Sequence, residues 1–77
     1  MEITVLFFGE LAEVAGASKM AVQNIEDTQS LTEWMVGKYP ALKNRTYRVA
    51  VNKEVISGKQ SLKNGDEVAL LPPYAGG

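Results

Sequence analysis

The sequence predicts an α+β fold, in which a mixed sheet of about five strands carries helices on one face. Three observations lead to this prediction. Apolar residues alternate with other residues in short segments near both ends of the chain, as they do in strands. Between these segments, two stretches place apolar residues at helical spacing. With 77 residues the chain has room for one domain, so these elements must share one core.

The first strand is predicted at residues 1–7, where Met1, Ile3, Val5 and Phe7 recur at every second position. Apolar residues also occupy the other face near its end. That pattern is typical of a central strand or of an exposed apolar patch.

A short helix is predicted at 10–15, followed by Gly16 at the position of a left-handed cap. A second strand is expected at 19–25. A longer helix is expected to begin at Ser30 as the N-cap residue, with Glu33 at the capping-box spacing and Pro40 as the stop. Four apolar residues of this helix form one stripe, which we expect to lie in the core: Leu31, Trp34, Met35 and Tyr39.

The second half of the chain is predicted to hold three more strands. The expected order is an irregular segment at 41–46, strands at 47–51, 54–56 and 67–71, and turns at 52–53 and 64–66. This order fits a β-grasp, ubiquitin-like fold. In such a fold the last strand pairs beside the first in the middle of the sheet.

The composition restricts the chemistry that the chain can perform. It contains no cysteine and no histidine, which excludes disulfides, thiolate or imidazole metal ligands, and a Cys or His nucleophile or base. No phosphate-binding glycine-rich motif is present either. We therefore expect no metal, no cofactor and no complete active site in this chain.

Charge and hydropathy indicate where the protein works. A net charge of −1, with scattered basic residues, gives no general attraction to nucleic acid or to an anionic membrane. No apolar run approaches the roughly 20 residues that span a bilayer, and residues 1–4 do not resemble a signal peptide. We expect a cytoplasmic protein that binds neither nucleic acid nor membrane.

The C-terminal segment is the strongest functional candidate. We expect a domain at 1–71 and an extended tail at 72–77, because Pro72 and Pro73 favour polyproline II and cannot donate hydrogen bonds to a sheet. Fully extended, these residues reach on the order of 20 Å. Gly76 and Gly77 would pass through a narrow tunnel, and the unhindered carboxylate of Gly77 suits activation by ATP to an acyl-adenylate. The alternative is a frayed, inert terminus.

Three segments of the chain together resemble a known family. GDEVALLPPYAGG, at 65–77, closely resembles the C-terminal signature of the small subunit of molybdopterin synthase, the MoaD family. ITVLFFGELAEVAG, at 3–16, resembles that family's first strand and helix, and VAVNKEV, at 49–55, fits its third strand and turn.

This resemblance implies a sulfur carrier in molybdenum cofactor biosynthesis. An E1-like adenylyltransferase (MoeB-like) with ATP would adenylate Gly77, and a sulfur donor would convert it to a thiocarboxylate. The tail would then enter the large subunit (MoaE-like), within a heterotetramer, and give sulfur to cyclic pyranopterin monophosphate to form the dithiolene of molybdopterin.

The resemblance also implies an apolar docking surface around the tail, with Phe7, Val55 and Leu71 in the matching positions. Tail residues Tyr74 and Ala75 are expected to contact the partner. Core packing remains the alternative for each of the three apolar residues, and it is as plausible as a docking role for Val55.

Other functions remain open from the sequence. A ThiS-like carrier for thiazole synthesis shares the Gly-Gly terminus, but such chains generally lack the Pro-Pro run after the last strand. A ubiquitin-like modifier would be joined to lysines of target proteins through Gly77. A plain β-grasp binding module with an inert tail is the simplest alternative.

Overall fold

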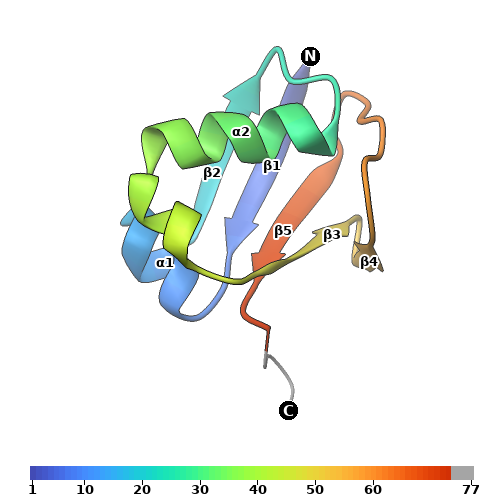
Figure 1. Ribbon diagram of the computed structural model, residues 1–77. Helices are drawn as coiled ribbons and strands as arrows, with labels where there is room; N and C mark the ends of the chain where they lie inside the picture. Colours follow the sequence, from blue (N-terminus) through green and yellow to red (C-terminus); the bar gives the residue numbers. More distant parts are fainter. Residues whose placement is uncertain (74–77) are drawn as a thin grey trace.

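The computed structural model describes residues 1–73, and residues 74–77 lie outside the described part. Figure 1 shows one twisted sheet with the helices packed against a single face. In chain order the elements are β1 (Glu2–Phe7), α1 (Glu10–Ala15), β2 (Lys19–Gln23), α2 (Thr28–Lys38), the 3-10 helix η1 (Pro40–Asn44), β3 (Arg48–Val51), β4 (Glu54–Ile56) and β5 (Glu67–Leu71).

The five-stranded sheet has the order β2-β1-β5-β3-β4. The two central strands, β1 and β5, run parallel, and every other neighbouring pair is antiparallel. This arrangement confirms the predicted mixed sheet, with the last strand beside the first and helices on one face. It is the β-grasp fold expected from the sequence.

The core lies between the sheet and the helices. On β1, Val5 and Phe7 face the helices, and they lie opposite Val68 and Leu70 of β5. Because side chains alternate along a strand, one set of residues from each strand is removed from water. The most completely buried side chains, all less than 2% exposed, are Ile3, Val5, Leu11, Leu31, Met35, Leu42, Val68 and Leu70.

Helix α2 begins earlier than the sequence suggested. Asp27 is the N-cap residue, and its carboxylate accepts a hydrogen bond of 2.7 Å from the backbone N–H of Ser30. The prediction of Ser30 as the cap, with a capping box to Glu33, is therefore wrong. The helix starts here because Thr28 is fixed from both sides: its N–H donates to the Gln60 carbonyl, and its hydroxyl accepts from the Gln60 N–H, each at 2.9 Å.

The predicted apolar stripe of α2 is confirmed in part. Leu31 and Met35 are fully buried, and the half-buried Tyr39 packs its ring against Phe7 with 6.2 Å between centroids. Trp34 is 40% exposed, so its placement in the core was wrong. Successive helical residues are about 100° apart, so Trp34 lies on the flank of the helix while Met35 faces the sheet.

The remaining predictions differ only in detail. The second strand ends at Gln23, and the third begins at Arg48. The segment expected to be irregular at 41–46 holds most of the 3-10 helix η1, which buries Leu42. Pro40 does stop the longer helix, but it also starts this next turn.

A carboxylate joins two turns at the end of the sheet distant from the C-terminus. Asp66 accepts hydrogen bonds from the Lys63 N–H at 2.8 Å and from the Asn52 side-chain amide at 3.0 Å. These bonds, first the one from Lys63, hold the pKa of Asp66 below its usual value of 3.8. The turn before β5 is thereby fixed to the turn between β3 and β4.

Candidate functional site

The face of the sheet opposite the helices carries an apolar patch. The strand register places Leu6 of β1 beside Ala69 of β5, Ala69 beside Ala50 of β3, and Ala50 beside Val55 of β4. The hydrogen bond of 3.1 Å from Phe8 N–H to the Leu70 carbonyl continues this register and brings Phe8 level with Leu71. We call these residues the apolar patch: Leu6, Phe8, Ala50, Val55, Ala69 and Leu71.

The patch is accessible. Val55 is 50% exposed and Phe8 45% exposed, and they are among the largest hydrophobic side chains left in contact with solvent. A shallow depression of about 300 Å³ lies over the patch, with Lys53 and Glu67 at its rim. An apolar centre with a charged rim is typical of a protein–protein contact surface.

The patch occupies only one end of the open face. Toward the other end, the same strand register places Glu2, Thr4 and Gln23 on or beside this face. The apolar end is where β5 finishes at Leu71 and the chain leaves the body as Pro72 and Pro73. Figure 1 shows the chain leaving the end of β5 on this side of the sheet, with the N-terminus at the opposite end of β1. The apolar patch and the root of the tail are therefore contiguous.

Two of the three predicted docking residues lie on this patch. Val55 is exposed and Leu71 is half-buried, and both belong to the open face. Their role in binding a partner stays a prediction, which the structure makes possible.

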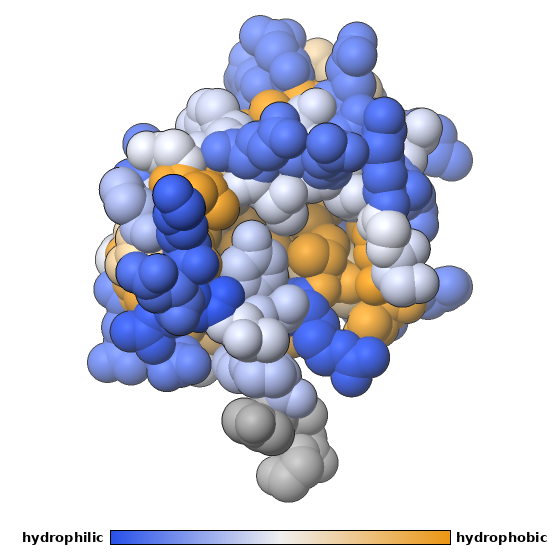
Figure 2. Space-filling view, in the orientation of Figure 1, coloured by the Kyte–Doolittle hydropathy of each residue, from blue (hydrophilic) through white to orange (hydrophobic). Residues whose placement is uncertain are grey.

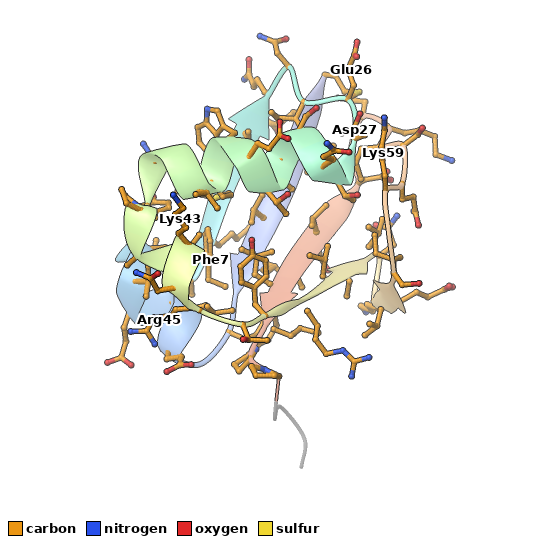
Figure 3. All side chains as sticks on the ribbon, viewed as in Figure 1. Phe7, Glu26, Asp27, Lys43, Arg45 and Lys59 are labelled. Carbon is orange, nitrogen blue, oxygen red and sulfur yellow. The ribbon has the colours of Figure 1, made fainter. Side chains whose placement is uncertain are left out.

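Phe7 requires a correction. It is only 3% exposed and lies between the sheet and the helices (Figure 3). There its ring meets the ring of Tyr39 edge-on. A docking role for Phe7 is therefore wrong, and the neighbouring Phe8 takes its place on the surface. Strict alternation from Ile3 and Val5 would have indicated this, since it assigns Phe7 to the core and Leu6 and Phe8 to the other face.

The predictions for the end of the tail concern residues that the structure does not describe. Tyr74, Ala75, Gly76 and Gly77 lie outside the described residues. Within residues 1–73, no group of His, Cys, Asp or Glu side chains is arranged to hold a metal ion. Over the same residues, no helix has the length and hydropathy needed to cross a membrane.

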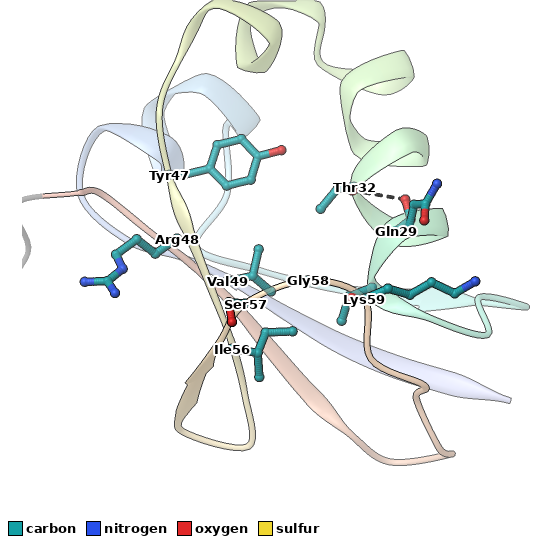
Figure 4. Close-up of a pocket in the computed structure, with 10 residues that line it drawn as sticks. Gln29, Thr32, Tyr47, Arg48, Val49, Ile56, Ser57, Gly58 and Lys59 are labelled. Carbon is teal, nitrogen blue, oxygen red and sulfur yellow. Dashed lines mark hydrogen bonds between the residues drawn. The ribbon is translucent and has the colours of Figure 1, made fainter.

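A second, more polar cleft lies on the helix side of the sheet. It lies between α2 and the β3–β4 hairpin, and its lining includes Val49 and Ile56, which Figure 4 shows in close-up. Figure 2 shows a hydrophobic area on this side of the molecule. Tyr47 lines it, and burial raises the pKa of this phenol above its usual value of 10.0. Figure 4 shows the charged ends of Arg48 and Lys59 pointing away from its centre, so the cleft brings no set of reactive groups together.

Several known proteins are similar to this chain over most or all of its length. A molybdopterin synthase sulfur carrier subunit from Chlamydomonas reinhardtii is 36% identical over 83 residues, covering 100% of both chains. Small archaeal modifier protein 1 from Haloferax volcanii is 33% identical, covering 91% of this chain and 94% of that protein. A solved protein–protein complex of subunits 1 and 2 of molybdopterin-converting factor from Helicobacter pylori 26695 includes a chain with a TM-score of 0.76 and 28% identity, covering 100% of both chains.

The family assignment rests on nearly the whole chain. The model of the ThiS family matches residues 5–77, a range that includes every residue of the apolar patch and continues to the last glycine. The 36% sequence identity to the algal carrier subunit, over the full length of both chains, supports the same assignment. This chain therefore belongs to the ThiS family.

Proposed function

We propose that this chain is the sulfur carrier subunit of a molybdopterin synthase, with the sulfur carried on Gly77. The observation that carries the proposal is the contact between two features at Leu71: the apolar patch ends there, and the tail begins there. A partner that covers the patch would receive the tail at a fixed place. The full-length similarity to a curated carrier subunit supports the same assignment.

The proposed chemistry uses the terminal carboxylate. A carboxylate oxygen of Gly77 attacks the α-phosphorus of ATP, giving the acyl-adenylate and releasing pyrophosphate. A sulfur nucleophile such as hydrosulfide then attacks the carbonyl carbon, expels AMP and gives the thiocarboxylate after loss of a proton. The acyl-adenylate is needed because a free carboxylate is a poor electrophile.

The residues of this chain would bind and present, while its partners supply the catalytic groups. We propose that the apolar patch docks on the large synthase subunit. The solved complex of subunits 1 and 2 of molybdopterin-converting factor from Helicobacter pylori supports a large-subunit partner. An E1-like enzyme would supply the ATP site, and a heterotetramer with two carrier subunits is the proposed assembly. The proposal includes a cytoplasmic location, in which the chain would meet ATP, the E1-like enzyme and the large subunit.

Intact mass spectrometry tests the proposal. The chain is incubated with the cognate E1-like enzyme, ATP and sulfide, and its mass should rise by one exchange of oxygen for sulfur. A chain without Gly77 is the control, and its mass should stay constant because the reacting carboxylate is misplaced. An unchanged mass of the full chain, or full synthase activity without Gly77, would contradict the proposal.

Conjugation to other proteins is a second candidate function. It is favoured by the 33% identity to small archaeal modifier protein 1 over nearly the whole chain. A modifier would form an isopeptide bond between Gly77 and a lysine amine of a target. Conjugates of higher mass that disappear when Gly77 is deleted would establish this function, alone or beside sulfur transfer.

A carrier for thiazole synthesis would use the same terminal chemistry. Pro72 and Pro73 favour the molybdopterin pathway, because thiazole carriers generally lack two prolines at this point. Binding assays against a large synthase subunit and a thiazole synthase would separate the two, since each pathway requires a different acceptor complex.

A further inference from the structure

The first residue of the tail packs against a glycine in the body. A Cβ atom added to Gly9 would lie 2.9 Å from Cγ of Pro72, closer than real Cβ contacts allow. Gly9 also has φ 56° and ψ −135°, a combination that residues with a side chain rarely adopt. The missing side chain therefore leaves the space that the Pro72 ring approaches.

The hydrogen bonds around this contact explain why the tail leaves the sheet here. The N–H of Phe8 donates to the Leu70 carbonyl at 3.1 Å, as the parallel pairing of β1 and β5 requires. The next bond of a parallel ladder would come from an N–H at residue 72, which proline lacks. The Phe8 carbonyl instead accepts from Leu11 N–H at 3.1 Å, and the chain turns into α1.

The result is a shared end point for the two central strands. Beyond Phe8, the segment that follows β1 turns through Gly9 into α1. Beyond Leu71, the segment that follows β5 packs against Gly9 through Pro72. Leu71 lies on the apolar patch, so the contact is one residue away from the surface proposed to dock on the partner. On its other side, Pro73 borders a cleft that contains the Arg45–Glu10 ion pair of 2.7 Å.

From this geometry we propose that Gly9 is a positioning residue for sulfur transfer. It lets Pro72 pack closely and thereby sets the direction in which the tail leaves the docking surface. The inference rests on the proposed carrier function. A terminal carboxyl group must reach a partner's catalytic groups within narrow limits, and a displacement of about 1 Å can cost about 100-fold in rate.

The chain provides two controls for a substitution at Gly9. Gly16, at the other end of α1, also has a positive φ of 72°, but a Cβ there would have nothing within 4 Å. Gly16→Ala therefore tests an alanine at positive φ without any contact to the tail, although the left-handed helical backbone of Gly16 (φ 72°, ψ 17°) accepts a side chain more readily than that of Gly9 (φ 56°, ψ −135°). Backbone strain at position 9 itself is controlled by the double variant Gly9→Ala/Pro72→Ala, which keeps the alanine and removes the contact. Pro72→Ala on the Gly9→Ala background removes the Cγ atom that the new methyl group would meet.

The first readout concerns the tail and needs no partner. A spin label attached to the Gly77→Cys variant broadens backbone amide signals of the body according to its average distance from them. Gly9→Ala should change this broadening pattern, and Gly16→Ala should preserve it. The double variant Gly9→Ala/Pro72→Ala should show the same pattern as Pro72→Ala alone, because the ring atom that the new methyl group would meet is absent from both. A pattern in Gly9→Ala that matches the unsubstituted chain would overturn the proposal.

The second readout concerns transfer, measured on folded, unlabelled chains with the E1-like enzyme and the large subunit. Gly9→Ala should lower kcat of adenylation or sulfur transfer by roughly 10- to 100-fold while changing affinity for the large subunit less than about twofold. Equal kcat values for Gly9→Ala and Gly16→Ala would contradict the positioning role. If Gly9→Ala fails to fold, Pro72→Ala alone should show the altered broadening pattern, and an unaltered pattern would contradict the proposal.

These readouts separate the two proposals. A changed tail direction in Gly9→Ala, together with no sulfur on Gly77 in any chain, would refute the carrier function and leave the structural role of Gly9 intact. Sulfur transfer at equal rates in all variants would support the carrier function and refute the role of Gly9.

Discussion

The two faces of the sheet use the same kinds of residue for different purposes. Phe7 and Phe8 are neighbours, yet Phe7 is 3% exposed beneath the helices and Phe8 is 45% exposed on the open face. The covered face is apolar over the length of β1, whereas the open face is apolar only beside the tail. The apolar side chains on the covered face therefore stabilise the fold. Those on the open face are concentrated where a partner would receive the tail.

Phe7→Ala should have the largest effect on folding. Truncating a buried phenylalanine typically lowers the free energy of unfolding by about 3–5 kcal/mol, through lost burial and the cavity left behind. In a domain of 77 residues this approaches the whole stability. Urea unfolding followed by circular dichroism measures the change, and Phe8→Ala is the control, with an expected loss below about 1 kcal/mol. Equal losses would break the contrast between the two faces.

Phe8→Ala should act on binding instead. If the apolar patch docks on the large subunit, removing its exposed aromatic ring should weaken the complex by about 1–2 kcal/mol, roughly 10-fold or more in Kd. Isothermal titration calorimetry with the large subunit measures this. Thr4→Ala is the matched control, because Thr4 lies on the same face of β1 at the polar end. An unaltered Kd for Phe8→Ala would remove the patch from the interface.

A smaller, pH-dependent effect is expected at the end of the sheet away from the tail. Because hydrogen bonds lower the pKa of Asp66 in the folded protein, its ionised form stabilises the fold above about pH 4. This stabilisation should be lost as the pH falls through 3.8 toward the lower folded pKa. Asp66→Asn should therefore reduce stability at neutral pH, and the difference from the unsubstituted chain should shrink in acid.

Urea unfolding at several pH values between about 2 and 7 measures the difference. Glu67→Gln is a suitable control, since Glu67 lies next in the chain and its side chain lines only the rim of the apolar patch. A difference between Asp66→Asn and the unsubstituted chain that stays constant with pH would show that ionisation of Asp66 contributes nothing.

The fold was predictable because local patterns and global pairing agree. Period-two alternation located the strands predicted at 1–7, 19–25 and 47–51, and turn signals located those at 54–56 and 67–71. The order of elements was then sufficient to place the last strand beside the first. Boundaries were less certain where two residues could serve one role. Asp27 and Ser30 both suit an N-cap, and the choice depends on Gln60, which is distant in sequence and holds Thr28 in place.

The candidate site was predictable in position but not in every residue. The Pro-Pro-Tyr-Ala-Gly-Gly sequence marks the tail without any knowledge of the fold. The apolar patch, by contrast, is assembled from four strands, and Ala50 and Ala69 give no signal until the register places them between larger residues. Similarly, the contact of Gly9 with Pro72 joins residues far apart in the chain, so spacing alone could not reveal it.

Trp34 provides the smallest of the expected effects, and it tests whether size and hydrophobicity alone decide what stabilises this fold. The side chain is 40% exposed on the flank of α2, and the Lys38 ammonium lies 5.6 Å from its ring centroid. An exposed cation–π pair contributes about 0.5–1 kcal/mol, so Trp34→Ala should lower the free energy of unfolding by about 1 kcal/mol. Met35→Ala, one residue along the same helix and fully buried, should cost about 2–5 kcal/mol. If Trp34→Ala cost as much as Met35→Ala, the flank of α2 would have to be counted with the core, and the assignment of apolar residues by sheet face would fail there.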